Sequence, residues 1–425
     1  MPVASYVLGI DGGTEGLRCG VFRCSDGAEV AYASSPYPTA FPHPGWAEQQ
    51  PQDWWAALVV AVRSALARAE ADHGVAASEV AALCVDTTCC TVVALNEDGT
   101  PLRPCLLWMD MRSAKQAEVI AATGDPALRL NGDGTGPVSA EWFLCKALWL
   151  KQHEPATWAA AAHVCEYQDF INLRLTGQYV GSTNNAAIRW HFQGGVYPPV
   201  SLLAALDMSD LIGKWPSRMV PPGTPIGSGL TPAAATALGL PAGLPVAQGG
   251  ADAFIGMLGL GVHQPGAMAL LTGSSHLHLG VCAQAAHAPG VWGTYSGAFP
   301  PMGPGQPATH VIEGGQTSTG SVAAWTRRLL CPDDMPSAAA YAMLDKLAEE
   351  IPLGCEGLLC QEFFQGNRTP HTDAAARGCF LGLTLSHSKA HVWRSVLEGV
   401  AFGTRLILDT MRCVARTCRT GTPLF

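Results

Sequence analysis

Short apolar runs separated by turn residues dominate the first hundred residues, and these runs have the length of β-strands. They occupy residues 6–10, 17–22 and 29–34, and a fourth run occupies residues 80–85. Between the third and the fourth, residues 52–70 carry apolar side chains at helical spacing, with an acidic residue in the first turn. The order β-β-β-α-β predicts an α/β fold rather than an all-helical or an all-strand one.

A similar hairpin is predicted in the second half of the chain. Residues 266–271 and 276–282 have strand character, and a turn of small polar residues joins them. Both hairpins place Thr and Gly at the tip, so we expect two domains of one design facing each other across a cleft. The stretch 221–250 is rich in Pro and Gly around a helical insert at 231–238, and it is the expected boundary between these domains.

Composition and charge narrow the class of protein. The chain has 425 residues, of which 48% are hydrophobic, enough for two or three well-packed domains. Only 14% are charged, against about 25% in an average soluble protein, so a disordered chain is excluded. With 25 basic and 34 acidic residues the net charge is −9, which disfavours nucleic-acid partners because a negative surface repels phosphate backbones.

Cysteine usage and apolar run length predict a cytoplasmic protein. The 15 cysteines are scattered through apolar segments and form no CxxC pair, so we interpret them as reduced, buried thiols rather than zinc or redox ligands. The N-terminus enters the first strand without the basic and apolar regions of a signal peptide. Every apolar run is interrupted well before 18 residues, so no membrane span is expected.

The tip of the first hairpin carries candidate phosphate-binding chemistry. Gly12 and Gly13 would let backbone N–H groups approach an anion closely, and Thr14 adds a hydroxyl. Asp11, at the end of a strand, could hold Mg²⁺ through water, and Arg18 could offset phosphate charge. The alternative is an ordinary Asp-Gly turn that binds nothing, and the motif is not a Walker loop.

The second hairpin tip offers related chemistry without a carboxylate. Thr272 and Gly273 begin a turn of small residues rich in hydrogen-bond donors. One such turn in each domain would clamp a polyphosphate from two sides. Taken alone, the second turn is equally an ordinary hairpin connection.

Two further motifs place carboxylates beside glycine pairs. Asp252 follows Gly249–Gly250 and precedes an apolar run, so it is either a helix cap or a general base at a domain junction, where ligands commonly bind. Glu313 and Gln316 flank another glycine pair that includes Gly315, and they could recognise hydroxyls while the glycine backbone lies near phosphate. The alternative for this second motif is a flexible loop before a helix at residues 321–330.

Taken together, these motifs resemble the FGGY carbohydrate kinases, sugar kinases of the actin-like ATPase superfamily. The resemblance extends over nearly the whole chain, and its most specific part is residues 378–398, which closely match the second signature of the family. The other matching segments are residues 9–14, 45–49, 107–112, 249–253 and 272–274. Residues 86–90, 139–146, 189–190 and 313–316 are most similar to the ribulokinase branch.

The resemblance implies a fold, a reaction and a set of roles. It implies two actin-like (ribonuclease H-like) domains, at residues 1–246 and 247–410, with ATP and Mg²⁺ as cofactors and phosphorylation of a ketopentose, preferably D-ribulose or L-ribulose, to its 5-phosphate. Xylulose or another polyol is the alternative substrate. A homodimer is one expected oligomeric state. Asp252 would be the catalytic base and Asp11 the magnesium residue. The sugar would be lined by Thr88, Cys89, Trp108, Arg189 and Glu313. The nucleotide phosphates would be held by Gly12, Gly13, Thr14, Arg18, Thr272, Gly273 and Gly315.

The C-terminal residues depart from the family pattern. Family members continue with a Gly-Gly strand-turn that holds adenine and ribose, and nothing after Gly403 resembles it. Residues 411–425 carry three arginines and no acid, and we expect a non-matching tail behind an incomplete second domain. This departure predicts exposed apolar surface. It also leaves a catalytically impaired sugar-binding protein as an alternative function, whereas an actin-like structural ATPase is disfavoured by the Trp108 segment and the second signature.

Overall fold

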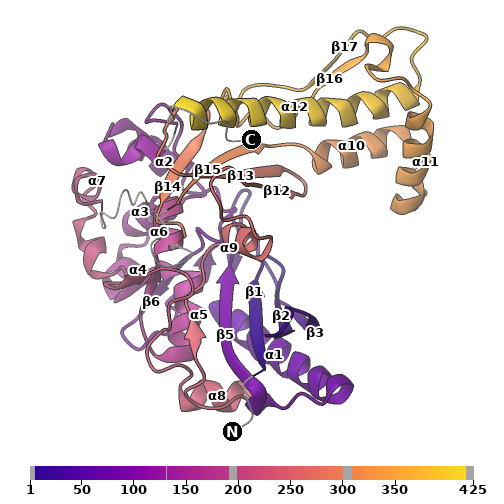
Figure 1. Ribbon diagram of the computed structural model, residues 1–425. Helices are drawn as coiled ribbons and strands as arrows, with labels where there is room; N and C mark the ends of the chain where they lie inside the picture. The colour runs from indigo at the N-terminus through magenta and orange to yellow at the C-terminus, as the bar shows by residue number, and fades with distance from the viewer. Residues whose placement is uncertain (1–4, 131, 191–198, 300–308, 418–425) are drawn as a thin grey trace. The chain divides into compact units, whose positions relative to one another are not determined.

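The computed structural model describes residues 5–130, 132–190, 199–299 and 309–417, and it divides into two compact units (Figure 1). The first unit comprises Met1–Leu128, Pro137–Gly261 and Tyr295–Thr309. The second unit comprises Arg129–Gly136, Val262–Thr294 and His310–Phe425.

A five-stranded mixed sheet forms the centre of the first unit, in the order β11-β5-β1-β2-β3. Its strands are β1 (Tyr6–Gly12), β2 (Gly16–Arg23), β3 (Glu29–Pro36), β5 (Val80–Thr87) and β11 (Val246–Ala247). The first three are antiparallel neighbours, whereas β5 runs parallel to β1 and β11 runs parallel to β5. The predicted β-β-β-α-β order is confirmed. The carboxyl ends of β1 and β5 therefore lie at the same edge of the sheet.

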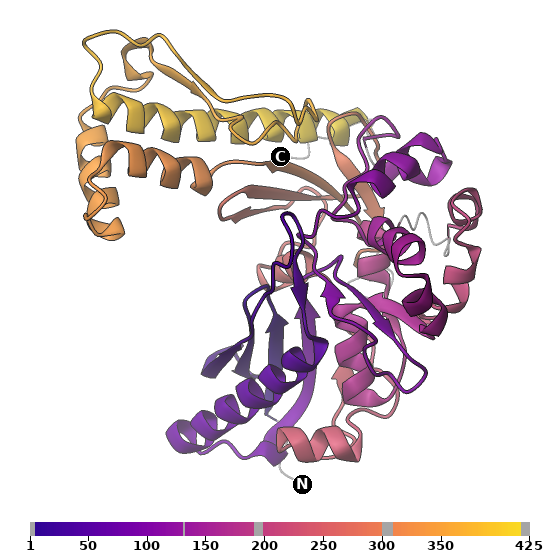
Figure 2. The same ribbon diagram turned by 180° about the vertical axis from the view of Figure 1, so that it is seen from behind.

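Helix α1 (Pro51–His73) covers one face of this sheet, and its ends follow from local sequence. Pro51 begins the helix, where a missing N–H costs nothing, and Asp53 lies in the first turn. Gly74 ends it at φ 67°, a left-handed conformation that glycine adopts without strain. Trp54 is fully buried and stacks at 3.8 Å on Tyr167 of α5 (Tyr167–Thr176). The back view shows α1 lying along the sheet (Figure 2).

The rest of the first unit is a second sheet, a pair of two-residue strands and a group of shorter helices. The second sheet has the order β4-β7-β6-β8, and β9 pairs with β10. The strands are β4 (Glu48–Gln49), β6 (Val92–Leu95), β7 (Cys105–Leu106), β8 (His163–Glu166), β9 (Gly181–Ser182) and β10 (Met219–Val220). The helices are α2 (Ala114–Ala122), α3 (Phe143–His153), α4 (Pro155–Ala160), α6 (Thr183–Arg189), α7 (Val200–Ala205), α8 (Pro232–Leu238) and α9 (Asp252–Gly259).

The second unit combines a four-stranded sheet with three helices. The sheet has the order β12-β13-β15-β14, and a separate pair β16-β17 lies along α12 (Figure 1). The strands are β12 (Met268–Thr272), β13 (His276–Cys282), β15 (His310–Gln316), β16 (Leu359–Gln361), β17 (Cys379–Leu381) and β14 (Trp292–Ser296), whose last two residues belong to the first unit. The helices are α10 (Gly320–Leu330), α11 (Ser337–Glu349) and α12 (Lys389–Thr417). The β12–β13 hairpin and α10 lie where the sequence predicts them.

The limits of the two units differ from the boundary that the Pro- and Gly-rich stretch suggested. The predicted boundary between residues 246 and 247 falls inside β11, and Val246 pairs with Leu83 of β5 in the first sheet. Likewise, the predicted start of the tail falls inside α12, where Met411 and Val414 are buried in a core cluster with Ile312. Residues 418–425 lie outside the described part of the chain.

Three expectations concern how apolar residues and thiols are exposed or buried. No helix among the described residues is long and apolar enough to span a membrane. In the second unit Leu381, Leu385 and Phe402 are more than half exposed. The expectation that the C-terminal departure leaves apolar surface exposed stays a prediction. The thiols of Cys19 and Cys105 are free and buried, and burial raises the pKa of each to about 12, as their interpretation as small hydrophobic residues requires. The interpretation as buried thiols is wrong for Cys24, Cys379 and Cys413, which are free and exposed.

Candidate active site

Three carboxylates meet at one edge of the first sheet. Asp11 is the second-to-last residue of β1 and is paired in register with Asp86, the second-to-last residue of the parallel strand β5. The amide of Thr87 donates to Gly250 O at 3.1 Å, and this contact places Asp252, the first residue of α9, beyond the same strand ends. Ligands of open α/β sheets commonly bind at the carboxyl ends of parallel strands. The fold therefore brings the predicted base and the predicted magnesium residue to one place.

The carboxylates differ in how they are held. Arg18 of β2 forms an ion pair with Asp11, and both side chains are partly exposed. Asp252 is a partly buried side chain that accepts the amide of Ala253 at 2.7 Å. Desolvation raises its pKa to about 6, and the charge of Asp11 acts in the same direction. Asp252 is therefore ionised at neutral pH yet more basic than an exposed carboxylate, as a general base should be.

Asp86 is a site residue that the sequence alone did not assign. Its Oδ1 atom is buried without a hydrogen-bond partner. Burial raises its pKa well above the ordinary value, and the charges of Asp11 and Asp252 add to this effect. A buried carboxylate oxygen without a partner needs an explanation, and a ligand or cation at this edge would supply one. The available signal was an Asp at the end of a second buried strand, but only the register shows that it neighbours Asp11.

The donor set at this edge suits a magnesium ion. Mg²⁺ takes oxygen ligands, commonly one or two carboxylates together with phosphate oxygens and water. In the part of the chain that the structure describes, no three His, Cys, Asp or Glu side chains are placed to hold a metal ion together. Asp11 and the unpartnered Oδ1 of Asp86 therefore fit an ion shared with a nucleotide, and they do not form a closed all-protein metal site.

Buried aromatic side chains fix the tip of the first hairpin. The amide of Gly13 donates to Gly16 O at 3.1 Å, and its carbonyl accepts from the hydroxyl of Tyr37. A Cβ atom on Gly12 would lie 2.9 Å from the ring of Tyr167, so only glycine fits there. The main chain of this turn is thus held in one conformation by its surroundings.

Thr14 connects the predicted phosphate turn with the predicted sugar residues. Its Oγ1 accepts from the indole Nε1 of Trp108 at 3.0 Å, and its carbonyl accepts from Gln49 Nε2 at 2.7 Å. The hydroxyl of Thr88 is buried without a partner, and the amide of Thr88 donates to Gly12 O at 3.0 Å. Thr14, Trp108 and Thr88 therefore lie around one tip.

Cys89 and Arg189 complete the predicted sugar residues of the first unit. The Cys89 and Cys90 sulfurs are 3.8 Å apart, and this contact together with burial raises the pKa of Cys89 well above its ordinary value, so the thiol is neutral. Arg189, at the end of α6, donates to the hydroxyl of Tyr295 at 2.7 Å. The site thus offers a neutral thiol, a cation and an indole, which suits a polyhydroxylated ligand.

The second hairpin tip is built differently. Residues 272–275 are exposed, and the amide of Gly273 donates to Ser275 O at 3.0 Å. The start of α10 is attached to this tip, because the amides of Thr319 and Gly320 donate to Ser274 O and Gly273 O at 3.0 and 3.1 Å. Thr272 and Gly273 therefore lie on a turn that backbone contacts hold in place.

The Glu313 motif is a strand and not a flexible loop. Glu313 and Gly315 belong to β15, opposite Leu279 and Leu277 of β13. The Glu313 side chain is fully buried and forms an ion pair with Arg368. The amide of Gly315 donates to Thr369 Oγ1 at 3.2 Å, so contact of this amide with phosphate, which stays a prediction, would require that bond to break.

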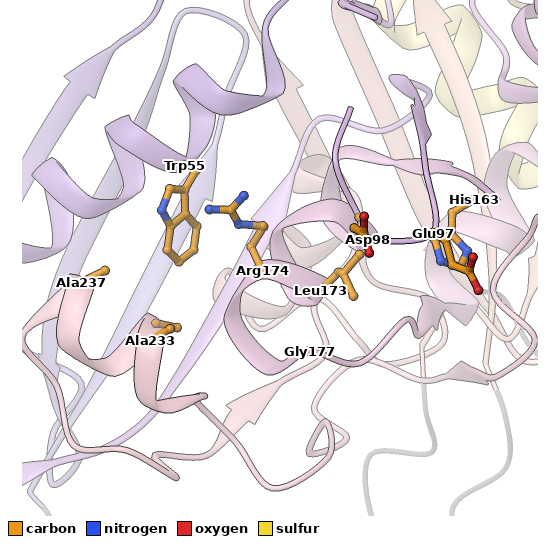
Figure 3. Close-up of a pocket in the computed structure, with 11 residues that line it drawn as sticks. Trp55, Glu97, Asp98, His163, Leu173, Arg174, Gly177, Ala233 and Ala237 are labelled. Carbon is orange, nitrogen blue, oxygen red and sulfur yellow. The ribbon is translucent and has the colours of Figure 1, made fainter. Parts of the chain in front are cut away.

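A separate cavity of about 590 Å³ lies elsewhere in the first unit (Figure 3). It is lined by α1, α5, α8 and the turn at residues 97–99, and the guanidinium of Arg174 lies 4.9 Å from the ring of Trp55. None of the predicted site residues lines it. We therefore do not assign the sugar or the nucleotide to this cavity.

Comparison with known proteins relates both units to one family. The N-terminal domain of the FGGY family of carbohydrate kinases matches residues 6–259, and the C-terminal domain of that family matches residues 268–422. The first match includes Asp252, and the second extends past residue 410. The match and the continuous helix α12 together argue against a separate tail beginning at residue 411.

Individual relatives agree with this match. A ribulokinase from Mycolicibacterium smegmatis is 31% identical over 458 residues, covering 99% of this chain and 77% of that protein. An FGGY carbohydrate kinase domain-containing protein from Homo sapiens is 28% identical, covering 98% of this chain and 80% of that protein. The crystal structure of a xylulose kinase from Rhodospirillum rubrum superposes with a TM-score of 0.84 at 32% identity, over 96% of this chain and 79% of that chain. The α/β fold is thus of the two-domain actin-like class.

Proposed function

The chain belongs to the FGGY family of carbohydrate kinases, and on that premise we propose that it transfers the γ-phosphoryl group of ATP to the terminal hydroxyl of a ketopentose. D-Ribulose and L-ribulose are the preferred substrates, and the product is the 5-phosphate. The ribulokinase relatives support this choice, as do the residues around Cys89. The xylulose kinase neighbour keeps xylulose as the competing substrate.

The observation that carries the proposal is the position of Asp252. It is a partly buried carboxylate with raised pKa, beside two other carboxylates at the end of parallel strands. Asp252 accepts the proton of the sugar hydroxyl as that oxygen bonds to the γ-phosphorus and the bond from phosphorus to the ADP oxygen breaks. Phosphoryl transfer asks little covalent chemistry of a protein beyond such positioning and charge stabilisation.

The remaining residues bind and orient the two substrates. Asp11 would hold Mg²⁺ through its water shell, and the ion would supply charge neutralisation for the phosphates when bound. Arg18 adds positive charge beside Asp11. The proposed phosphate-binding residues are Gly12, Gly13 and Thr14 in the first unit, and Thr272 and Gly273 in the second. The sugar contacts Thr88, Cys89, Trp108, Arg189 and Glu313, and the unpartnered Thr88 hydroxyl supports its part in this set.

A substrate panel tests the proposal. ADP release is measured with D-ribulose, L-ribulose, D-xylulose and glycerol as acceptors, and the proposal expects the highest kcat/KM with a ribulose. Equal or greater activity with D-xylulose or glycerol contradicts the ribulose assignment. Turnover of none of the four, combined with sugar binding and no ATP binding in calorimetry, contradicts the kinase activity and identifies a sugar-binding protein instead.

A further inference from the structure

Cys90, beside the predicted sugar residue Cys89, adopts a backbone conformation that its side chain disfavours. Its φ angle is 66°, in the left-handed region that glycine occupies easily and other residues rarely adopt. Such a residue persists in a fold only when surrounding contacts determine its conformation. The contacts that hold the Cys90 peptide therefore decide where Cys89 presents its thiol.

Two buried ionisable side chains form hydrogen bonds with the backbone amide and the backbone carbonyl of Cys90. The amide of Cys90 donates to Glu166 Oε2 at 3.1 Å, and the carbonyl of Cys90 accepts from Lys146 Nζ at 2.9 Å. Both side chains are completely buried. Hydrogen bonds are electrostatically stronger away from water than in it, so these two buried contacts hold a short turn in place.

Lys146 also donates a hydrogen bond to the main chain of Trp108. Its ammonium group donates to Trp108 O at 2.8 Å and to Glu141 O at 2.6 Å, in addition to Cys90 O. All three ammonium protons therefore have acceptors, although burial lowers the pKa of Lys146. Lys146 thus fixes the main chain of Trp108 relative to that of Cys90.

Glu166 also accepts hydrogen bonds from the segment that carries Arg189. Its Oε2 also accepts from Asn185 Nδ2 at 2.9 Å on α6, and its Oε1 accepts from the indole Nε1 of Trp190 at 2.6 Å, directly after Arg189. Burial raises the pKa of Glu166 to about 7, and the hydrogen bond from Trp190 opposes the rise. Cys89, Trp108 and Arg189 come from three separate segments, and these two side chains connect all three.

We propose that Lys146 and Glu166 are positioning residues of the sugar pocket, which set the left-handed turn at Cys90 and the placement of Cys89, Trp108 and Arg189 around it. The proposal rests on the proposed function, because it assumes that the pocket binds a sugar. Neither side chain contacts the sugar in this account, and both act through the main chain of the residues that do.

The test compares Lys146→Met with a matched control. Lys146→Met keeps the length of the side chain and removes its three donated bonds. It is expected to raise the sugar KM about 10- to 100-fold, with a smaller effect on kcat. Asn172→Leu on α5 is the control, because it removes another fully buried polar side chain, whose amide donates to Gln248 Oε1 at 3.2 Å and not to the main chain of the turn. A KM rise in the control equal to that in Lys146→Met overturns the proposal.

A second variant separates positioning from general loss of stability. Glycine adopts positive φ without strain, so in Cys90→Gly the conformation of the turn depends less on the hydrogen bonds from Lys146. The KM increase caused by Lys146→Met is therefore expected to be at least about threefold smaller in Cys90→Gly than in the wild-type background, in a double-mutant cycle. The same increase in both backgrounds contradicts the proposal.

A structural readout keeps the result independent of the sugar. In the crystal structure of Lys146→Met, φ of Cys90 is expected to leave the left-handed region, and an unchanged turn overturns the positioning role. If the wild-type protein binds no sugar in calorimetry, the proposed function fails, while the Cys90 conformation in the variant still decides whether Lys146 holds the turn.

Discussion

The two glycine-containing hairpins look alike in sequence and differ in how the fold supports them. The tip of the β1–β2 hairpin is enclosed by Tyr37, Tyr167 and Trp108, and the strand before it ends in Asp11 beside Asp86. The tip of the β12–β13 hairpin is exposed, carries Thr272 where the first carries Asp11, and is held by backbone amides from the start of α10. The comparison shows that two hairpins of similar sequence differ in their surroundings: the first tip lies beside carboxylates, whereas the second is a turn without a carboxylate.

The largest effect is expected from Asp252→Asn, which removes the proposed base. Turnover should fall about 10²- to 10⁴-fold, since this is the usual contribution of general base catalysis. The folded-state pKa of about 6 lies above the ordinary 3.8, so the contribution of Asp252 to stability is fully present below pH 3.8 and is lost as the pH rises through 6.

The same variant should therefore be more stable than the wild type at pH 8. The neutral amide avoids a buried charge, and the expected gain in the free energy of unfolding is about 1–3 kcal/mol. Steady-state kinetics and thermal unfolding at pH 8 measure both effects. Normal turnover would remove Asp252 from the base role, and a lower Tm would contradict its description as a charge that is destabilised by desolvation.

Asp11→Asn should have the next largest effect. Losing the proposed magnesium residue is expected to lower kcat about 10²-fold and to raise the Mg²⁺ concentration that gives half-maximal rate. Asp26→Asn, at an exposed turn paired with Arg23, is the matched control and should leave both quantities unchanged. Equal Mg²⁺ dependence of Asp11→Asn and wild type would place the ion elsewhere.

The smallest effects should distinguish the two hairpin tips. Thr272→Val is expected to raise the KM for ATP about three- to tenfold and to leave the KM for the sugar unchanged. Thr14→Val should raise both, because the hydroxyl of Thr14 also accepts the indole N–H of Trp108. If the two variants behave alike in KM measurements, the contrast between the tips has no functional meaning.

Local patterns predicted the elements well where the elements are long. The predicted strand at 17–22 is β2 (Gly16–Arg23), and the predicted helix at 321–330 is α10 (Gly320–Leu330). The two-residue strand β11 could not be found this way, because its neighbours in sequence are Pro- and Gly-rich and its partner β5 is more than 150 residues away. The sequence left two alternatives for the motif at Glu313, a motif that recognises hydroxyls or a flexible loop. The structure shows that the motif is part of strand β15, which pairs with β13.

The candidate site was only partly predictable for the same reason. Asp11 and Asp252 stand beside glycine pairs, which is a local signal, whereas Asp86 becomes a site residue through its register with Asp11. Lys146 lies within the apolar segment 142–150, and a lone charge there signals a buried role without naming its acceptors. These acceptors come from three distant segments, and only folding places them together.

The most direct test of the account is the pH dependence of kcat/KM for the preferred ketopentose. This quantity reports the pKa values of the free enzyme, and Asp252 must be ionised to accept the hydroxyl proton. The account predicts that kcat/KM of the wild type rises with pH through an apparent pKa near 6 and levels off above it. The residual kcat/KM of Asp252→Asn should not show this rise. The account would be contradicted by a wild-type kcat/KM that is independent of pH between 5 and 8. It would also be contradicted by the same rise with pH in Asp252→Asn.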